Sequence, residues 1–351
     1  MTAVDPTTGS CPAPRPETEL ILLGHGAGGR LSAELIGHVL VPALGAVAPG
    51  GPPEDAAVVA VGQTALALST DAYVVDPLFF PGGDIGALAV HGTINDLAMR
   101  AAMPVALTVA YIVEEGFPIE ELRRVAASVG RAAADAGVPV VTGDTKVVGR
   151  GAADRIFVTT AGLGRCPPDP LPSAARARPG DAILLSGPIG GHGVTVLSSR
   201  EGLGFEADVA SDTRPLHRLV AAMMAAGGDG VHSLRDPTRG GLAATLNEIA
   251  VASGTGAEVE ELSLPVGEPV RAACELLGLD PLSVANEGCL VAYVAPERAQ
   301  AVLEAMRSRP EGTGAVRVGT VSEAGPVMLR TAMGARRVID MPLGEQLPRI
   351  C

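Results

Sequence analysis

The chain has 351 residues, of which 47% are hydrophobic and 19% charged, so it is long enough for two domains and too apolar to be disordered. Its net charge of -13 repels phosphate backbones, and with 2% aromatic residues it offers few rings for base stacking, so we expect no nucleic-acid partner. Five cysteines without a C-x-x-C pair argue against a disulfide framework and against structural zinc. Because neither a secretory signal nor a membrane span is recognisable, we expect a cytoplasmic protein without membrane contact.

The first half of the chain alternates between helical and extended apolar patterns. Residues 1–19 are rich in proline, threonine and acidic residues, and we interpret them as a disordered leader. The elements predicted next are a short strand at Leu20–Leu23, a helix at Leu31–Leu40, a hairpin at Val58–Thr70 broken at Gly62, a buried helix at Ile85–Ala102, a strand at Val105–Val113, a helix at Ile119–Ala136, and strands at Val138–Thr142 and Arg155–Leu163.

A proline-dense segment, Cys166–Pro172, separates this half from the second and is interpreted as a domain boundary. The second half is predicted to hold a strand at Ala182–Ser186, a glycine-rich turn, helices at Leu216–Ala226, Leu242–Ser253 and Pro296–Arg307, and terminal strands. Such alternation predicts an α/β or α+β fold rather than a helical bundle. Residues 341–351 lack periodicity, so we expect an exposed, mobile tail. The predicted organisation is a leader at 1–19, domains at 20–166 and 167–340, and the tail at 341–351.

The glycine cluster Gly24–Gly29 spells G-x-G-x-x-G between a predicted strand and a predicted helix. That pattern is typical of dinucleotide-binding folds, but the acidic residue that should end a second strand is missing. The cluster is therefore interpreted either as a flexible turn or as a loop that contacts phosphate. No G-x-x-x-x-G-K-[ST] motif occurs, so ATP binding of the P-loop kind is unsupported.

Aspartates recur at predicted strand ends and in turns. They are Asp55, Asp71, Asp96, Asp144 and Asp236. Carboxylates of this kind, shared with substrate phosphates, suit Mg²⁺, although an isolated aspartate more commonly caps a helix or forms a turn. Asp96 differs because it lies in an apolar run, where burying a lone charge is costly. A metal ligand is the better interpretation there.

Other polar residues allow functional and structural interpretations. Lys146 follows a predicted strand and would either clamp a phosphate, act as a base, or remain a solvated surface lysine. Glu287 lies at the start of an apolar run and is interpreted either as a base or as a turn residue. His192, in the second glycine turn Gly190–Gly193, is either a hydrogen-bonded turn residue or a catalyst, and His91 is interpreted as a core histidine.

The most distinctive feature is the last residue, Cys351. A thiol on a mobile tail suits a carrier that moves a covalently bound group between sites, and the alternative is a cysteine without function. Prenylation is excluded because it requires a cysteine four residues from the end. Arg349 would favour the thiolate of Cys351, whereas the adjacent α-carboxylate would disfavour it.

Seven segments carry these motifs. They are Gly24–Gly29, Ser69–Gly86, His91–Met99, Thr142–Val148, Arg235–Ala243, Asn286–Gly288 and Pro348–Cys351. Together they resemble the HypE family of hydrogenase-maturation carbamoyl dehydratases, in order from about Leu20 to the end. The resemblance implies a two-domain PurM-like fold, shared with aminoimidazole ribonucleotide synthetase and selenophosphate synthetase. It also implies a homodimer formed through the N-terminal domains, with ATP bound between domains and dimer partners.

Site residues follow from the same resemblance, motif by motif. The implied ATP-binding residues are Asp55, Asp71, Asp84, Asn95, Asp96, Gly143, Asp144 and Thr145. The implied Mg²⁺ ligands are Asp55, Asp71, Asp96, Asp144 and Asp236. The implied catalytic residues are Cys351, Lys146, Glu287 and Arg349. Glu54 departs from the second aspartate that relatives often carry beside Asp55, so a metal role for residue 54 is not expected.

The implied reaction dehydrates a carbamoyl group on Cys351 to a thiocyanate. An amide oxygen leaves poorly, so ATP would first phosphorylate it, with Mg²⁺ and Lys146 offsetting charge on the transferring group. Glu287 or neutral Lys146 would then take the N–H protons as phosphate leaves. A mobile tail would receive its carbamoyl group from a HypF-type carbamoyltransferase and deliver cyanide to a HypC–HypD-type iron-loading complex.

Three other functions remain open at the level of sequence. A phosphoryl-transfer synthetase acting on a free small molecule, such as a selenophosphate or purine-pathway synthetase, would gain nothing from the terminal Pro348–Cys351. A non-catalytic adaptor would use the tail only for docking, and the many aspartate turns argue against it. A dinucleotide oxidoreductase rests on the glycine cluster alone.

Overall fold

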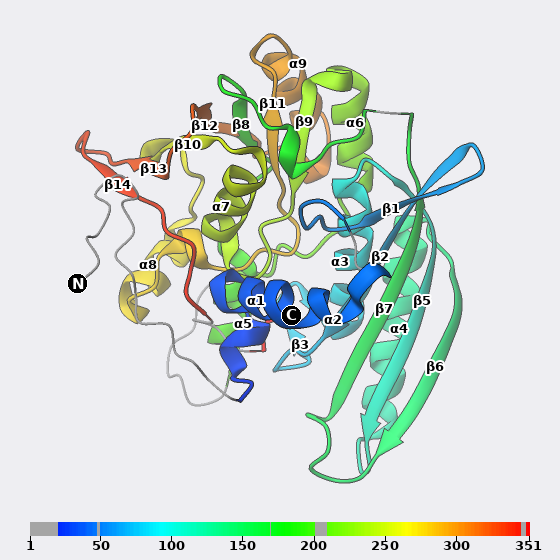
Figure 1. The fold of residues 1–351 in the computed structure, drawn as a ribbon. Coiled ribbons are helices and arrows are strands. Elements are labelled where there is room, and N and C mark those ends of the chain that lie inside the picture. The colour runs from blue at the N-terminus through cyan, green and yellow to red at the C-terminus, as the bar shows by residue number, and fades with distance from the viewer. Residues whose placement is uncertain (1–19, 48–49, 169, 201–208, 345–348) are drawn as a thin grey trace.

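Two β-sheets organise the chain in the computed structural model, which describes residues 20–47, 50–168, 170–200, 209–344 and 349–351 (Figure 1). One sheet of five strands lies entirely before Cys166, and one sheet of seven strands lies entirely after Asp181. The expected mixed α/β class with two main sheets is therefore confirmed. The leader predicted at residues 1–19 lies outside the described residues.

The first sheet has five strands in the order β1-β2-β7-β5-β6, of which only β5 and β6 run parallel. Its strands are β1 (Ala57–Val61), β2 (Thr64–Tyr73), β5 (Met103–Glu114), β6 (Val140–Val148) and β7 (Ile156–Arg165). The predicted hairpin is confirmed, with its turn at Gly62, whose φ of 61° suits glycine. One predicted boundary was wrong: the strand expected to end at Thr142 continues to Val148, because it pairs in parallel with β5 along that length.

Helices α3 (Ile85–Met99) and α4 (Ile119–Ala136) pack against one face of this sheet (Figure 1). Nearly every residue of α3 is buried, because the helix lies between the sheet and the second half of the chain, where Ala98 and Met99 join another core. The opposite face is open in the single chain. Leu68 on that face is 46% exposed, whereas its neighbours Ala67 and Ser69 are buried, as strand alternation requires.

The second sheet has seven strands in the order β14-β13-β10-β12-β8-β11-β9. They are β8 (Ala182–Leu185), β9 (Val231–Arg235), β10 (Gly256–Glu260), β11 (Val291–Val294), β12 (Val316–Ser322), β13 (Val327–Arg330) and β14 (Arg336–Val338). Along β8, Ile183 and Leu185 face α7 (Gly241–Ser253), while Ala182 and Leu184 face α6 (His217–Gly227) and α9 (Pro296–Arg307). Burial on both faces explains why this strand reads as a continuous apolar run.

Short elements complete the chain. They are η1 (Leu23–Gly26), α1 (Gly29–Leu35), the π-helical η2 (Ile36–Leu40), α2 (Val41–Leu44), η3 (Gly45–Val47), β3 (Phe79–Phe80), β4 (Gly83–Asp84), η4 (Ala174–Arg176), α5 (Gly191–Ser198), η5 (Gly228–Gly230), η6 (Glu261–Ser263), α8 (Glu268–Leu277), η7 (Pro281–Ser283) and η8 (Pro310–Gly312). The described part of the chain contains no helix long and apolar enough to cross a membrane.

The strand predicted at Leu20–Leu23 was wrong. These residues are exposed and pair with no strand among the described residues, and Leu23 already begins η1. The glycine cluster instead packs against the loop after β9: a Cβ added at Gly28 would lie 2.7 Å from the carbonyl oxygen of Arg239. Without a preceding strand, the cluster does not form the dinucleotide-binding turn.

Candidate active site

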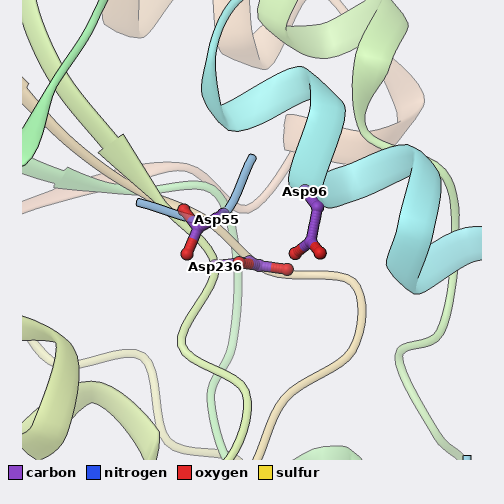
Figure 2. Close-up of side chains that lie close together, drawn as sticks. All are labelled: Asp55, Asp96 and Asp236. Carbon is purple, nitrogen blue, oxygen red and sulfur yellow. The ribbon is translucent and has the colours of Figure 1, made fainter. Parts of the chain in front are cut away.

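Three carboxylates from distant parts of the sequence meet between the two halves of the chain. Asp55 precedes β1, Asp96 lies on α3, and Asp236 follows β9. One oxygen of each lies within 4.8 Å of the others, and Figure 2 shows the three side chains converging. Oxygen ligands gathered at this spacing are what Mg²⁺ prefers. We call these residues the acidic triad.

The electrostatics of the acidic triad are unfavourable for the protein alone. Burial raises the pKa of Asp96 and of Asp236, and repulsion from neighbouring aspartates raises both further. Burial also raises the pKa of Asp55, although an ion pair with Arg235 opposes that shift. The Oδ2 atom of Asp55 is buried and has no hydrogen-bond partner within the described chain. A cation would offset the repulsion and satisfy this oxygen.

Asp71 links the acidic triad to the end of the chain. It lies on β2, accepts a hydrogen bond from the hydroxyl of Tyr73 at 2.9 Å, and its charge raises the pKa of Asp96, Glu287 and Cys351. Asp71 is not one of the carboxylates whose oxygens lie within 4.8 Å of one another. Of the five aspartates expected around the metal, the structure thus gathers three and holds a fourth beside them.

Of the described tail residues, Leu343 and Arg349 are exposed, Cys351 is partly buried and Ile350 is buried, so the expectation of an exposed tail is wrong at Ile350. Ile350 is 4% exposed and packs against Val194, Val270 and Val284. Cys351 packs against the core beneath the first sheet. Residues 345–348 lie outside the described chain, so the predicted mobility of that stretch stays a prediction.

The carboxyl group of Glu287 is close enough to the Cys351 thiol to raise the pKa of that thiol. Burial raises the pKa of the thiol well above its ordinary value, and the charge of Glu287 raises it further. Burial likewise raises the pKa of Glu287, whose Oε1 atom is buried and has no hydrogen-bond partner in the described chain. The thiol is therefore held neutral next to a carboxyl group whose proton affinity is higher than that of an exposed glutamate.

Arg239 is a cation of this site that nothing in the sequence singled out separately. Its guanidinium donates to the carbonyl of Gly26 at 2.8 Å, and the charges of Cys351, Asp71 and Glu287 raise its pKa. Its position in the Arg235–Ala243 motif was the only available signal. Arg239 thus joins the glycine cluster to the thiol site.

The side chain of Arg349 was expected near the Cys351 thiol, and it points elsewhere. Its guanidinium forms ion pairs with Asp154 and with Asp76, the latter at 3.4 Å. Its backbone adopts a positive φ of 53°, which turns the side chain outward although the next residue but one is Cys351. The structure gives Arg349 an anchoring contact instead of a role in ionising the thiol.

Asp84 and Asn95, both expected to bind ATP, already have protein partners. Asp84 caps α3 by accepting from the backbone N–H groups of Gly86 and Ala87, and its other oxygen accepts from Ser128. The amide of Asn95 donates to the carbonyls of Arg214 and Glu287. Its oxygen accepts from the N–H of Leu216. Both therefore position neighbouring elements, and Asn95 fixes the backbone at Glu287.

The segment Gly143–Lys146 lies apart from the acidic triad. Asp144 and Lys146 pair in register with Ala110 and Ile112 of β5, on the open face of the sheet that also carries Leu68. Lys146 forms an ion pair with Asp144 at 2.9 Å, and hydrogen bonding to Lys146 lowers the pKa of Asp144. Gly143 and Thr145 alternate with them, and Figure 1 shows β6 at the outer edge of the sheet. In one chain, this face does not meet the buried thiol.

Glu54 is occupied elsewhere, as the departure from the family pattern suggested. Its carboxylate accepts hydrogen bonds from Ser173 and from the N–H of Ala174, and it pairs with Arg100 at 3.2 Å. His91, expected in the core, contacts Thr213, and burial lowers its pKa to about 4. Neither residue belongs to the acidic triad.

Comparison with known proteins places this geometry in a family. Residues 53–166 match the AIR synthase related protein, N-terminal domain, and residues 178–330 match the corresponding C-terminal domain. The solved structure described as AaThiL complexed with AMPPCP and TMP shares the fold, with a TM-score of 0.65 at 19% identity over 86% of this chain and 94% of that one.

Higher identity links the chain to more specific relatives. Carbamoyl dehydratase HypE of Azotobacter vinelandii is 54% identical, over 93% of this chain and 96% of its own length. The enzyme of the same name from Escherichia coli K12 is 45% identical, over 94% and 99%. A crystal structure of hydrogenase maturation protein HypE in complex with ATP superposes with a TM-score of 0.79 at 49% identity, over 95% of this chain and 100% of that one. The chain therefore belongs to the HypE family of hydrogenase-maturation carbamoyl dehydratases.

Proposed function

We propose that this chain dehydrates an S-carbamoyl group on its own Cys351 to a thiocyanate, at the expense of ATP. The observation that carries the proposal is the buried contact between the Cys351 thiol and Glu287, beside Arg239 and Asp71. A terminal cysteine without function would gain nothing from a buried site of this kind. Membership of the HypE family supports the same reaction.

ATP and Mg²⁺ are assigned to the acidic triad. The ATP complex of a HypE relative supports nucleotide binding in this fold. Three carboxylates, one buried and two half-buried, with one unpartnered oxygen among them, fit a divalent cation. Bound there, Mg²⁺ would supply charge neutralisation for the triphosphate and for the phosphoryl group in transfer.

The chemistry then follows from the groups around the thiol. The carbamoyl oxygen attacks the γ-phosphorus of ATP and ADP leaves. The nitrogen loses one of its two protons to solvent, which gives an imidate phosphate whose carbon is bonded to the sulfur. Glu287 takes the remaining N–H proton, the C–O bond breaks, and phosphate leaves as the C≡N bond forms. Arg239 stabilises the negative charge that develops on oxygen, because its guanidinium already faces the thiol.

Lys146 and Asp144 are assigned to the site of a partner chain rather than to their own. Both lie on the open face of the first sheet, which also exposes apolar residues such as Val59 and Leu68. An exposed apolar sheet face is typical of an interface between subunits. A homodimer through this face would bring Lys146, with Gly143 and Thr145 on the same strand, to the neighbouring nucleotide.

The partners follow from the need to load and unload Cys351. A solved complex of HypE with HypF supports a HypF-type carbamoyltransferase as the donor. The acceptor of cyanide is assigned to a HypC–HypD-type complex, because a thiocyanate has to reach iron. Both steps require Ile350 and Cys351 to leave the site where the structure places them. Cys274, Cys289 and Cys351 are free thiols, which suits a reducing, cytoplasmic setting.

Phosphate release tests this function. Chains carrying the S-carbamoyl group, mixed with ATP and Mg²⁺, should release phosphate in proportion to the carbamoylated fraction. The Cys351→Ser variant should bind ATP and release none under the same conditions. Phosphate release from Cys351→Ser that a free small molecule stimulates would instead establish the synthetase alternative.

A further inference from the structure

The last three residues of the chain are each held by a different kind of contact. The carbonyl of Arg349 accepts from the N–H of Asp76 at 3.2 Å and from Arg200 at 2.9 Å. The side chain of Ile350 fills an apolar pocket between α5 and α8, and its carbonyl lies 2.9 Å from Nε2 of His192. These contacts determine where along the site Cys351 comes to rest.

His192 has one consistent protonation pattern in this network. A backbone carbonyl only accepts, so Nε2 of His192 donates to Ile350. Burial lowers the pKa of His192, so the ring is neutral and Nδ1 accepts from the hydroxyl of Ser211 at 2.8 Å. Ser211 in turn accepts from the N–H of Thr213 at 3.2 Å. The ring packs edge-on against Phe80, with 5.5 Å between the centroids, so its direction is fixed.

Helix α5, which carries His192, is tied at its N-cap to the residue next to Glu287. The side-chain oxygen of Asn286 accepts from the N–H of Gly190 at 2.7 Å, and its amide donates to the carbonyl of Pro237 at 2.8 Å. Gly190 has a φ of 84° and approaches Val270 so closely that an added Cβ would lie 2.7 Å from it. The donor for the Ile350 carbonyl and the partner of the Cys351 thiol therefore move as one rigid unit.

We propose that His192 and the Ile350 pocket form a recognition site that sets the register of the tail, with His192 as a positioning residue and Ile350 as the residue that the pocket selects. This inference rests on the proposed function. The carbonyl contact fixes the backbone one residue before the thiol, and the pocket accepts one apolar side chain. A tail displaced by one residue would withdraw the thiol from Glu287. It would also bury the side chain of Arg349 in the pocket, and burying an unpaired guanidinium is costly.

Alkylation of Cys351 tests the register without ATP or a carbamoyl donor. The full chain is treated with iodoacetamide, and the C-terminal peptide is followed by mass spectrometry. Docked Cys351 is protected, so the rate reports the undocked fraction. His192→Leu and Ile350→Ala should each raise the alkylation rate about tenfold, as expected for the loss of one buried contact. His192→Gln should restore protection, because its amide is able to donate to the Ile350 carbonyl and accept from Ser211.

Two controls separate positioning from folding. His38→Leu replaces an exposed histidine and should leave the alkylation rate unchanged. Ile350→Ala alters only the tail, so it tests the pocket even if a substitution at His192 disturbs the body of the protein. Nucleotide binding and melting temperature should remain those of the wild type in Ile350→Ala.

The dehydration rate in a single turnover completes the test. His192→Leu should slow it in proportion to the lost docking, with recovery in His192→Gln. Equal protection of Cys351 in the wild type, His192→Leu and Ile350→Ala would overturn the proposal. An equal loss of Cys351 protection in His192→Leu and His192→Gln would also overturn the proposal, because His192 would then act only through packing. A wild type that protects Cys351 but never dehydrates it would instead contradict the proposed function alone.

Discussion

The Cys351 thiol lies against the carboxyl group of Glu287, and burial raises the pKa of both groups. The contact joins the last residue of the chain to a loop more than sixty positions earlier in the sequence. It keeps the free thiol neutral while it is docked. It also places a carboxyl group with a raised pKa beside the atom that carries the substrate. The following predictions test what this arrangement and its surroundings do.

Removing the base should stop the last step of the reaction. Glu287→Gln keeps the shape of the side chain and loses its ability to take a proton, so we expect a decrease of roughly 100-fold or more in the single-turnover dehydration rate. Transfer of the carbamoyl group to Cys351 should be unaffected. Mass spectrometry of the C-terminal peptide over time measures both steps. A Glu287→Gln rate within a factor of two or so of the wild type would assign the base elsewhere.

Docking of the unmodified tail should depend on pH. Because the docked thiol has a raised pKa, docking is fully favourable below the ordinary thiol pKa of about 8.5 and is lost as the pH rises above it. The apparent pKa of Cys351 alkylation should therefore lie above the ordinary value in the wild type. It should return toward the ordinary value in Ile350→Ala, whose tail docks poorly. An ordinary apparent pKa in both proteins would show that the thiol is not enclosed in solution.

Mg²⁺ binding should release protons. Burial and mutual repulsion raise the pKa of Asp96 and Asp236 in the metal-free protein, so a cation has to displace protons. We expect Mg²⁺ affinity to increase as the pH rises above the ordinary aspartate range through the raised pKa values of these two groups, measured by calorimetry in buffers of different ionisation enthalpy.

Removing one carboxylate of the acidic triad tests the same account in a second way. Asp236→Asn should lose Mg²⁺ binding and raise the melting temperature of the metal-free protein by roughly 1–3 °C, since it removes a repelling charge. Affinity that is independent of pH, or a lower melting temperature in Asp236→Asn, would contradict this account of the acidic triad.

Placing a charge on the open face of the first sheet should separate the subunits. Leu68 is 46% exposed on that face, and Leu68→Glu would bury a carboxylate in the proposed interface. We expect light scattering to report a monomer that also fails to dehydrate carbamoylated Cys351, because Lys146 would no longer reach a neighbouring site. Leu276→Glu on α8, where the side chain is 68% exposed, is the matched control and should remain a dimer. Dehydration by monomeric Leu68→Glu would show that Lys146 is not supplied by a partner.

Much of the fold could be predicted from the sequence where local signals agree. The helix at Ile119–Ala136 was predicted to the residue, because Gly137 ends it in a left-handed conformation and its apolar positions follow a helical period. The helix at Pro296–Arg307 begins at a proline suited to the first turn. Asp55 and Asp236 of the acidic triad could be identified by their position beside predicted strands, and Asp96 by its position in an apolar run. Sequence gave no basis for deciding which of the five would meet.

The errors share one physical origin, which is that pairing and burial depend on distant residues. β6 was expected to end at Thr142, and its pairing with β5 carries Asp144 and Lys146 onto the open face. The tail looked exposed because it lacks periodicity, yet α5 and α8 supply the pocket for Ile350. Arg349 was placed at the thiol by adjacency in sequence, whereas its backbone conformation turns it toward Asp76 and Asp154.

The most direct test of the central claim is the mass of the C-terminal peptide of the full chain. The protein is incubated with a HypF-type carbamoyl donor system, and then with or without ATP and Mg²⁺. The account predicts a carbamoyl adduct on Cys351 that loses the mass of one water only when ATP is present. A carbamoyl adduct that persists while ATP is hydrolysed, or a Cys351 that is never modified, would contradict it.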